Sequence, residues 1–212
     1  MTEGGHEDRD ATPDLAVGVG PHPQPWPDDP RLDADLLAHG DRRNVVDRYR
    51  YWRLEAIVAD LDTRRHDFGV AIENWQHDLN IGTIVRTANA FLAREVVIVG
   101  RRRWNRRGAM VTDRYQHIRH LPTVSDLALY AQAEGYSVVG IDNLPGAEPI
   151  EQITLPRNAL LLFGQESVGL TDEARATASL VCSIAQYGST RSINAGVAAG
   201  IAMHAWIRQH AQ

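Results

Sequence analysis

The segment HDLNIGTIVRTANAF, residues 77–91, predicts an amphipathic helix that carries an arginine away from its apolar face. Apolar residues from Ile81 to Phe91 recur at intervals of three and four, which is the pattern of one helix face. Asn80 precedes them, where a side-chain oxygen can cap free backbone N–H groups. Arg86 lies roughly 140° from the centre of the apolar stripe, at about 100° per residue. A lone arginine there is usually a solvated residue, so the rest of the chain has to decide its role.

The composition limits the classes of protein to which the chain can belong. The 212 residues, 43% of them hydrophobic, suffice for one well-buried domain plus an appendage. No apolar run is long enough to cross a bilayer, and the chain does not open with a signal peptide. The single cysteine, Cys182, excludes an internal disulfide framework and a zinc site built from cysteines. We therefore expect a cytoplasmic protein without a membrane partner, in which Cys182 is buried and inert.

The net charge of −5 is unevenly distributed. Residues 1–40 hold nine acidic residues and two arginines, which leaves 18 acidic and 20 basic residues in the rest of the chain. The main body is therefore nearly neutral, and a polyanionic partner must be held by a local patch rather than by overall charge.

Three segments are expected along the chain. Residues 1–40 are rich in Pro, Gly and Asp without an apolar period, which predicts a disordered acidic tail. Residues 41–66 predict an accessory helical segment with arginines between its apolar positions. In residues 67–212, short Val, Ile and Leu runs alternate with helical patterns, which predicts an α/β domain with a mostly parallel sheet and helices on both faces.

The expected strands of this domain are 68–74, 95–100, 136–142, 159–164 and 180–184, and the expected helices are 80–92, 125–134, 171–178 and 194–209. Parallel sheets bind ligands beyond the carboxyl ends of their strands, so the residues after each strand are the candidates for function.

Two strand ends carry unusual segments. After 159–163 comes GQESVGL, residues 164–170, in which glycines on either side of Glu166 allow tight turns or a close ligand. The plainer interpretation is a turn before a helix capped by Thr171. After 180–184 comes a polar loop and then a helix rich in Gly and Ala, where Gly196 and Gly200 allow another segment or subunit to approach closely. Asn194 or Ser192 can cap that helix.

Several common chemistries have no motif here. The sequence lacks G-x-G-x-x-G after a strand, a phosphate-binding loop with lysine, G-x-S-x-G and H-E-x-x-H. His117 and His120 lie beside an apparent edge strand with no third ligand nearby, so we expect ordinary surface histidines and no metal site.

Three segments in order, NIGTIVRTANAF, LLFGQESVGL and SIAQYGSTRSINAGVAAGIA, closely resemble the three motifs of the SpoU/TrmH class of SPOUT RNA methyltransferases. The resemblance implies a C-terminal trefoil knot, S-adenosylmethionine as cofactor, a homodimer, and methylation of a ribose 2′-hydroxyl in tRNA or rRNA, with no DNA partner.

Carried over by motif, the resemblance implies a catalytic set of Asn80, Arg86, Glu166, Ser192 and Asn194. The implied cofactor-binding positions are Gly164, Ile184, Gln186, Gly188 and Ile193.

Arg86 could act either as a base or as an electrostatic stabiliser, and physical chemistry decides between these roles. The family's arginine is often given a part in activating the hydroxyl, but a guanidinium is effectively always protonated. We therefore expect Arg86 to stabilise the developing alkoxide and to hold the adjacent phosphate. Two alternatives stay open at this point: an RNA-binding protein of this fold without turnover, and an enzyme of the same fold that methylates a base. Between the two RNAs, the near absence of further domains favours tRNA.

An arginine-rich loop follows the strand at 95–100. In GRRRWNRRGAM, residues 100–110, five arginines surround Trp104. A charge run is usually a solvated loop with an anchoring tryptophan. Because the body is otherwise neutral, we expect RNA contacts from Arg102, Arg103, Arg106 and Arg107, with Trp104 either stacking on a base or anchoring the loop.

Overall fold

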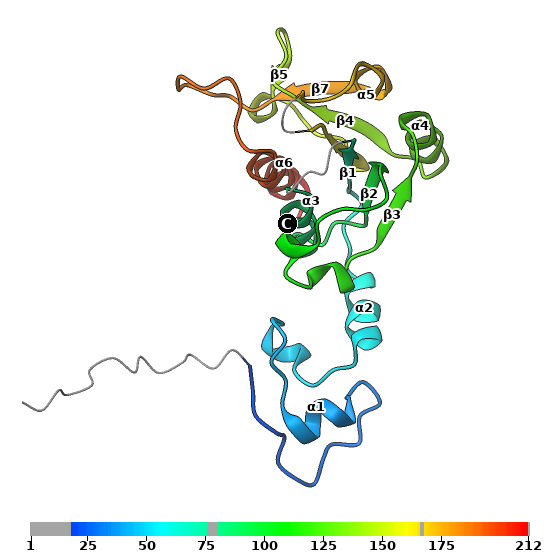
Figure 1. Cartoon of the computed structure of the whole chain (residues 1–212), viewed down its shortest axis with the longest axis vertical. Coiled ribbons are helices and arrows are strands. Elements are labelled where there is room, and N and C mark those ends of the chain that lie inside the picture. Colours follow the sequence, from blue (N-terminus) through cyan, green and yellow to red (C-terminus); the bar gives the residue numbers. More distant parts are fainter. Residues whose placement is uncertain (1–17, 76–79, 166–167, 212) are drawn as a thin grey trace, which may run out of the picture. The chain divides into compact units, whose positions relative to one another are not determined.

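A computed structural model describes residues 18–75, 80–165 and 168–211 (Figure 1). The chain divides into two compact units, residues 1–57 and residues 58–212. Within the described ranges, no helix is both long and apolar enough to span a membrane.

The second unit is built on one seven-stranded sheet in the order β3-β2-β1-β6-β4-β7-β5, and every neighbouring pair is parallel (Figure 1). The five expected strands and the parallel sheet are confirmed. The strands are β1 Gly69–Asn74, β2 Val96–Gly100, β3 Ile118–Leu121, β4 Ser137–Ile141, β5 Glu148–Pro149, β6 Ala159–Phe163 and β7 Leu180–Ser183. The central strands are buried along their whole length: all six residues of β1 and all five of β6 are buried. This is the pattern of a parallel sheet that is covered on both faces.

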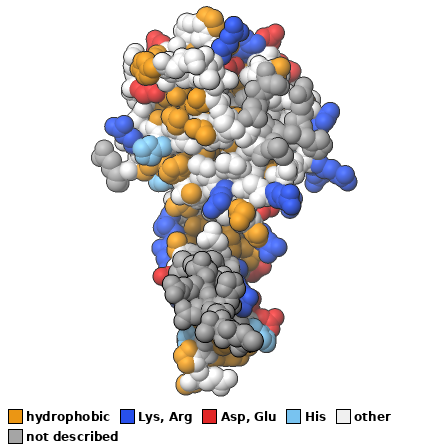
Figure 2. Space-filling view, turned by 60° about the vertical axis from the view of Figure 1, so that its left-hand side comes forward, with side chains coloured by type: hydrophobic (Ala, Val, Ile, Leu, Met, Phe, Trp, Pro, Cys, Tyr) orange, Lys and Arg blue, Asp and Glu red, His pale blue; other side chains and the backbone are white. Residues whose placement is uncertain are grey.

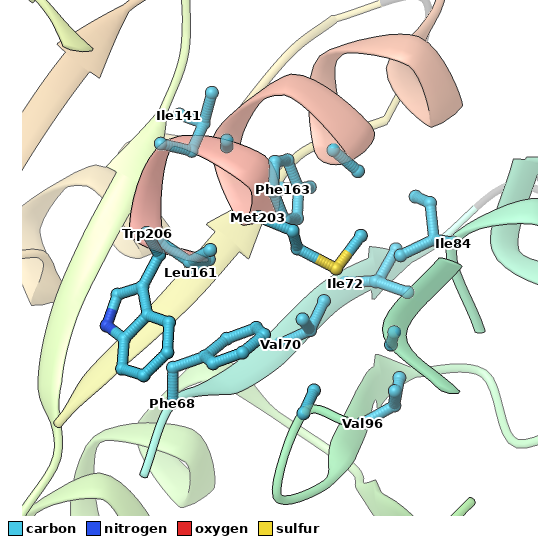
Figure 3. Close-up of a cluster of buried hydrophobic side chains, with 14 of the residues drawn as sticks. Phe68, Val70, Ile72, Ile84, Val96, Ile141, Leu161, Phe163, Met203 and Trp206 are labelled. Carbon is cyan, nitrogen blue, oxygen red and sulfur yellow. The ribbon is translucent and has the colours of Figure 1, made fainter. Parts of the chain in front are cut away.

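Helices cover both faces of this sheet, as expected. The helices α3 Asn80–Ala90 and α6 Ala195–His210 pack on one face, and α4 Val124–Ala133 and α5 Asp172–Thr177 on the other. Figure 3 shows the first of these cores, where Met203 and Trp206 of α6 meet Phe68 and Val70 at the start of β1. The trefoil knot implied by the resemblance stays a prediction.

The structure of the first unit differs from the expected division of the chain at residue 40. The prediction that residues 1–40 form a disordered tail is wrong for residues 18–40, because they contain α1 Ala34–His39 and pair with residues farther along the chain. Isolated bridges join Val19 to Asp41 and Leu32 to Trp52. The accessory segment 41–66 contains a 3-10 helix, Asp47–Tyr49, and α2 Leu54–Asp62, within which the two units divide.

A buried carboxylate explains why so polar a segment is ordered. Asp41 is completely buried and accepts hydrogen bonds from Arg43 Nε at 2.9 Å and from the Tyr51 backbone N–H at 3.0 Å. Burial alone would raise the pKa of Asp41, but these hydrogen bonds and the charge of Arg43 outweigh it and lower the pKa to about 2. Asp41 therefore stays ionised and joins distant parts of the first unit.

Candidate functional site

A cavity of about 260 Å³ opens at the carboxyl ends of three adjacent strands, β6, β4 and β7. Its walls come from the loops that follow these strands and from the start of α6. They include Asp142, Asn143, Leu144, Gly164, Gln165, Gly169, Arg175, Ile184, Gln186, Arg191, Ser192, Ile193, Ala195 and Ala198. This is the position at which a parallel sheet is expected to bind a ligand.

Four of the five positions expected to bind a cofactor line this cavity: Gly164, Ile184, Gln186 and Ile193. Gly188 does not line it. That residue lies exposed in the loop between β7 and α6, and a Cβ added there would meet no atom within 4 Å. The resemblance implies a cofactor contact at Gly188, which stays a prediction.

The loop after β6 is a turn that requires glycine at both ends. Gln165 and Gly169 form a backbone bridge, with N···O distances of 3.1 and 2.9 Å. A Cβ on Gly164 would lie 2.0 Å from the carbonyl carbon of Gly169, and Gly169 itself has φ +69°. Any side chain at 164 would therefore force this wall of the cavity to move.

Hydrogen bonds join the three loops. Asp142 Oδ2 accepts from the Leu170 N–H at 3.0 Å, and Asn143 Nδ2 donates to the Arg191 carbonyl at 3.0 Å. The side-chain oxygens of Gln165 and Gln186 are buried, and neither has a hydrogen-bond donor in the part of the chain that the structure describes. The wall is thus a preorganised frame that retains unused acceptors.

Asn194 connects the cavity to the helix that carries Arg86. Its Oδ1 caps α6 by accepting from the N–H groups of Gly196 and Val197, which identifies it, rather than Ser192, as the capping residue. Its Nδ2 donates to Asn80 Oδ1 at 2.9 Å, and Asn80 is the first residue of α3. Two predicted site residues, 114 positions apart in sequence, are therefore in direct contact.

Arg86 is exposed on α3, between two neighbouring segments. Four residues earlier, on the same helix face, Gly82 lets the backbone of the arginine-rich loop approach so closely that a Cβ would lie 2.7 Å from the Ala109 nitrogen. On the other side, Thr83 packs beside Gly196 of α6. Across the ranges 18–75, 80–165 and 168–211, the Arg86 guanidinium forms no ion pair.

The arginine-rich loop, residues 100–110, is anchored at both of its ends. Trp104 is half-buried against the core, and the Arg106 guanidinium lies 5.5 Å from its ring centroid. The five arginines are exposed, and Arg102, Arg103, Trp104, Asn105 and Arg106 line an open hollow of about 580 Å³. Trp104 thus anchors the loop, and stacking of a base on its ring stays a prediction.

The remaining candidates are placed as follows. Glu166 lies outside the described residues. His117 Nε2 lies 2.8 Å from Asp62 Oδ1, and His120 Nε2 lies 2.7 Å from the Gly100 carbonyl. No cluster of three potential metal ligands occurs among the residues with described positions. Burial raises the pKa of Cys182 to about 11, which keeps this thiol protonated.

Sequence reasoning missed five polar residues of the cavity wall: Asp142, Asn143, Gln165, Arg175 and Arg191. A usable signal existed for the first two, because both directly follow the C-terminal residue of β4. Arg175 lies on the short helix α5 and Arg191 in the loop before α6. For neither residue does the sequence indicate which way the side chain points.

The fold and the cavity can now be compared with known proteins. Residues 67–204, well over half of the chain, match the model of the SpoU rRNA Methylase family. The chain belongs to this family. The matched region contains the whole sheet, the cavity and α3.

Individual relatives agree with the family match. The chain is 27% identical over 163 residues to the tRNA (guanosine(18)-2'-O)-methyltransferase of Escherichia coli K12, covering 76% of this chain and 70% of that protein. It is 30% identical to an uncharacterized tRNA/rRNA methyltransferase of Mycolicibacterium smegmatis, covering 85% of this chain and 60% of that protein. The AdoMet-bound rRNA methyltransferase of Sinorhizobium meliloti superposes with a TM-score of 0.61 at 26% identity, over 71% of this chain and 60% of that one.

Proposed function

We propose that this chain transfers a methyl group from S-adenosylmethionine to a ribose 2′-hydroxyl of RNA, with tRNA favoured over rRNA. The observation that carries the proposal is the Asn194–Asn80 hydrogen bond, which fixes a strand-end cavity of about 260 Å³ against the helix that presents Arg86. The family match and the relative named for 2'-O-methylation of tRNA support the same reaction.

The cavity fits the cofactor by its chemistry. The glycine at 164 lets the chain pass close to the cavity without a side chain, and the buried oxygens of Gln165 and Gln186 can accept from amino groups. When bound, S-adenosylmethionine supplies an activated methyl group. Ile184 and Ile193 would supply apolar walls, and the loop frame would fix the orientation that an in-line displacement requires.

Arg86 serves the acceptor side of the reaction. Its guanidinium stays protonated, so it stabilises negative charge on the 2′-oxygen and holds the adjacent phosphate rather than accepting the proton. Asn80 and Asn194 hold α3 in place against the cavity, and Ser192, on the cavity wall, orients the ribose or the cofactor.

The arginine-rich loop provides the RNA contacts in this proposal. Its exposed arginines adjoin the Gly82 face of α3, one helical turn from Arg86, so RNA bound there would reach the reacting edge. This local basic patch would hold a polyanion although the rest of the chain is nearly neutral.

We also propose that the chain forms a homodimer through the outer face of α6. Val197 and Ile201, one turn apart on this helix, are 55% and 38% exposed. Figure 2 shows hydrophobic side chains gathered on the side of the second unit that the rotation brings forward. An exposed apolar face of this kind marks an association surface.

The cofactor site is tested by two glycine substitutions. Gly164→Ala should greatly weaken binding of S-adenosylmethionine in calorimetry, because its Cβ would collide with the Gly169 backbone at 2.0 Å. Gly188→Ala is the matched control and should bind normally, because nothing lies within 4 Å of its Cβ. Equal affinities for the two variants would remove this cavity from consideration.

The reaction is tested with labelled S-adenosylmethionine and total RNA, followed by digestion and identification of the labelled nucleoside. Wild type should yield a 2′-O-methylated nucleoside, and Arg86→Ala should lower the rate by ~10²–10³ with cofactor affinity unchanged. Arg86→Lys should also be poor, since ammonium lacks the bidentate fork. Arg157→Ala, an exposed arginine ahead of β6, is the control. A methylated base would refute the ribose assignment, and near-normal activity of Arg86→Ala would make Arg86 a surface residue.

The RNA surface is tested by replacing Arg102, Arg103, Arg106 and Arg107 with alanine together. RNA affinity should fall, and the log–log salt dependence should flatten by roughly 0.7–0.9 for each phosphate that the variant no longer neutralises. Cofactor affinity should stay the same. Unchanged affinity and slope would mean that RNA docks elsewhere, with the arginines of 42–53 as the next candidate.

The dimer is tested by light scattering of the intact chain, which should give twice the monomer mass of 23.6 kDa. Ile201→Glu should shift the mass toward one chain, because a buried unpaired carboxylate disfavours association. A monomeric mass for a fully active wild type contradicts the proposal.

A further inference from the structure

The last two residues of β1 are polar and completely buried. Glu73 and Asn74 both have 0% exposure at the carboxyl end of a strand whose other side chains are apolar. Successive side chains of a strand point to opposite faces. Val70 and Ile72 belong to the core beneath α3 and α6, and Ala71 belongs to the core beneath α4 and α5. Asn74 therefore points to the first face and Glu73 to the second.

Asn74 holds the arginine-rich loop. Its Nδ2 donates to the carbonyls of Arg101 at 2.7 Å and Arg103 at 2.9 Å, and its own carbonyl accepts from the Arg101 N–H at 2.9 Å. Its Oδ1 is buried, with no hydrogen-bond partner within residues 18–75, 80–165 and 168–211. The side chain thus acts here as a double donor, which few other residues of this size could replace.

Glu73 holds the loop that walls the cavity. Its carboxylate accepts from the Thr171 N–H at 2.9 Å, the Thr171 hydroxyl at 2.6 Å and Trp75 Nε1 at 2.9 Å. Thr171 follows directly on the loop 164–170 and caps α5, so Glu73 fixes the far end of this loop. A buried carboxylate is costly unless several donors satisfy it, and here three do.

We propose that Asn74 and Glu73 are positioning residues that set the two functional loops separately. Asn74 shapes the arginine-rich loop for RNA, and Glu73 shapes the cavity wall for the cofactor. This inference rests on the proposed function, to which it adds two residues that touch neither RNA nor cofactor. The two side chains leave β1 on opposite faces, and the hydrogen bonds of Asn74 to residues 101 and 103 share no partner with those of Glu73 to Thr171.

The experiment compares Asn74→Asp with Glu73→Gln in the full chain. The first is isosteric but removes both donors, and the second removes one strong acceptor. Hydrogen exchange should speed up in residues 100–109 for Asn74→Asp alone, and in residues 164–172 for Glu73→Gln alone. Because this readout needs no ligand, it decides the positioning claim even if the proposed function fails.

The two variants should also differ in which ligand they lose, RNA or S-adenosylmethionine. Asn74→Asp should weaken RNA binding about tenfold or more and flatten its salt slope, with S-adenosylmethionine affinity within about twofold of wild type. Glu73→Gln should show the reverse. If Asn74→Asp melts far below wild type, Asn74→Ala, which removes the donors without adding charge, takes its place. The proposal is overturned if exchange rises equally in both loops, or if both variants lose both ligands alike. If the quadruple arginine variant binds RNA normally while the exchange pattern holds, the RNA assignment fails but the positioning of the loops stands.

Discussion

Helix α3 is held in place by two close contacts at glycines, one with the backbone of a neighbouring loop and one between the Thr83 side chain and α6, and the candidate site depends on them. At Gly82 the arginine-rich loop comes within 2.7 Å of the position a Cβ would occupy, and at Gly196 the start of α6 lies 3.2 Å from Thr83 by the same measure. These contacts fix α3 from two sides while the Asn80–Asn194 hydrogen bond fixes its first turn. Arg86 is exposed on this helix, one turn after Gly82. Because the helix is fixed, only the arginine side chain has to be ordered when a ligand arrives.

The cavity and the arginine-rich loop are built from different kinds of chemical groups. The cavity is framed by turns, backbone bridges and a buried carboxylate, which suits a small ligand recognised by its polar edges. The arginine-rich loop instead presents exposed charge on an anchored backbone, which suits a polyanion whose phosphates recur along its length. The exposed arginines are concentrated in one loop, so a nearly neutral domain can offer a basic surface as well as a cavity wall of mixed polarity.

Much of this arrangement could be read from the sequence because it rests on local patterns. The buried strands, the helix carrying Arg86 and the glycine turn at 164–169 each follow from periodicity or from residues that few conformations accept. The ordered part of the first unit could not be read in this way. Its residues 18–40 have a disordered composition, and their order comes from distant partners, such as the buried Asp41 and the Arg31 guanidinium 4.3 Å from the Trp52 ring. The position of Gly188 outside the cavity lining could not be read from the sequence either, since a motif position does not determine which side of a loop faces the cavity.

Glu73 and Asn74 show a limit of motif reasoning that is more general. In the sequence they look like the end of an ordinary buried strand, and neither residue lines the cavity or the hollow beside the arginine-rich loop. Their importance appears only when the partners are named, because each side chain satisfies backbone groups at a loop or at its end. Loops that carry function must be held by something other than a helix or strand ladder, and buried polar side chains at a strand end are well suited to this. The precision of such a site therefore depends on residues one layer behind those that contact the ligand.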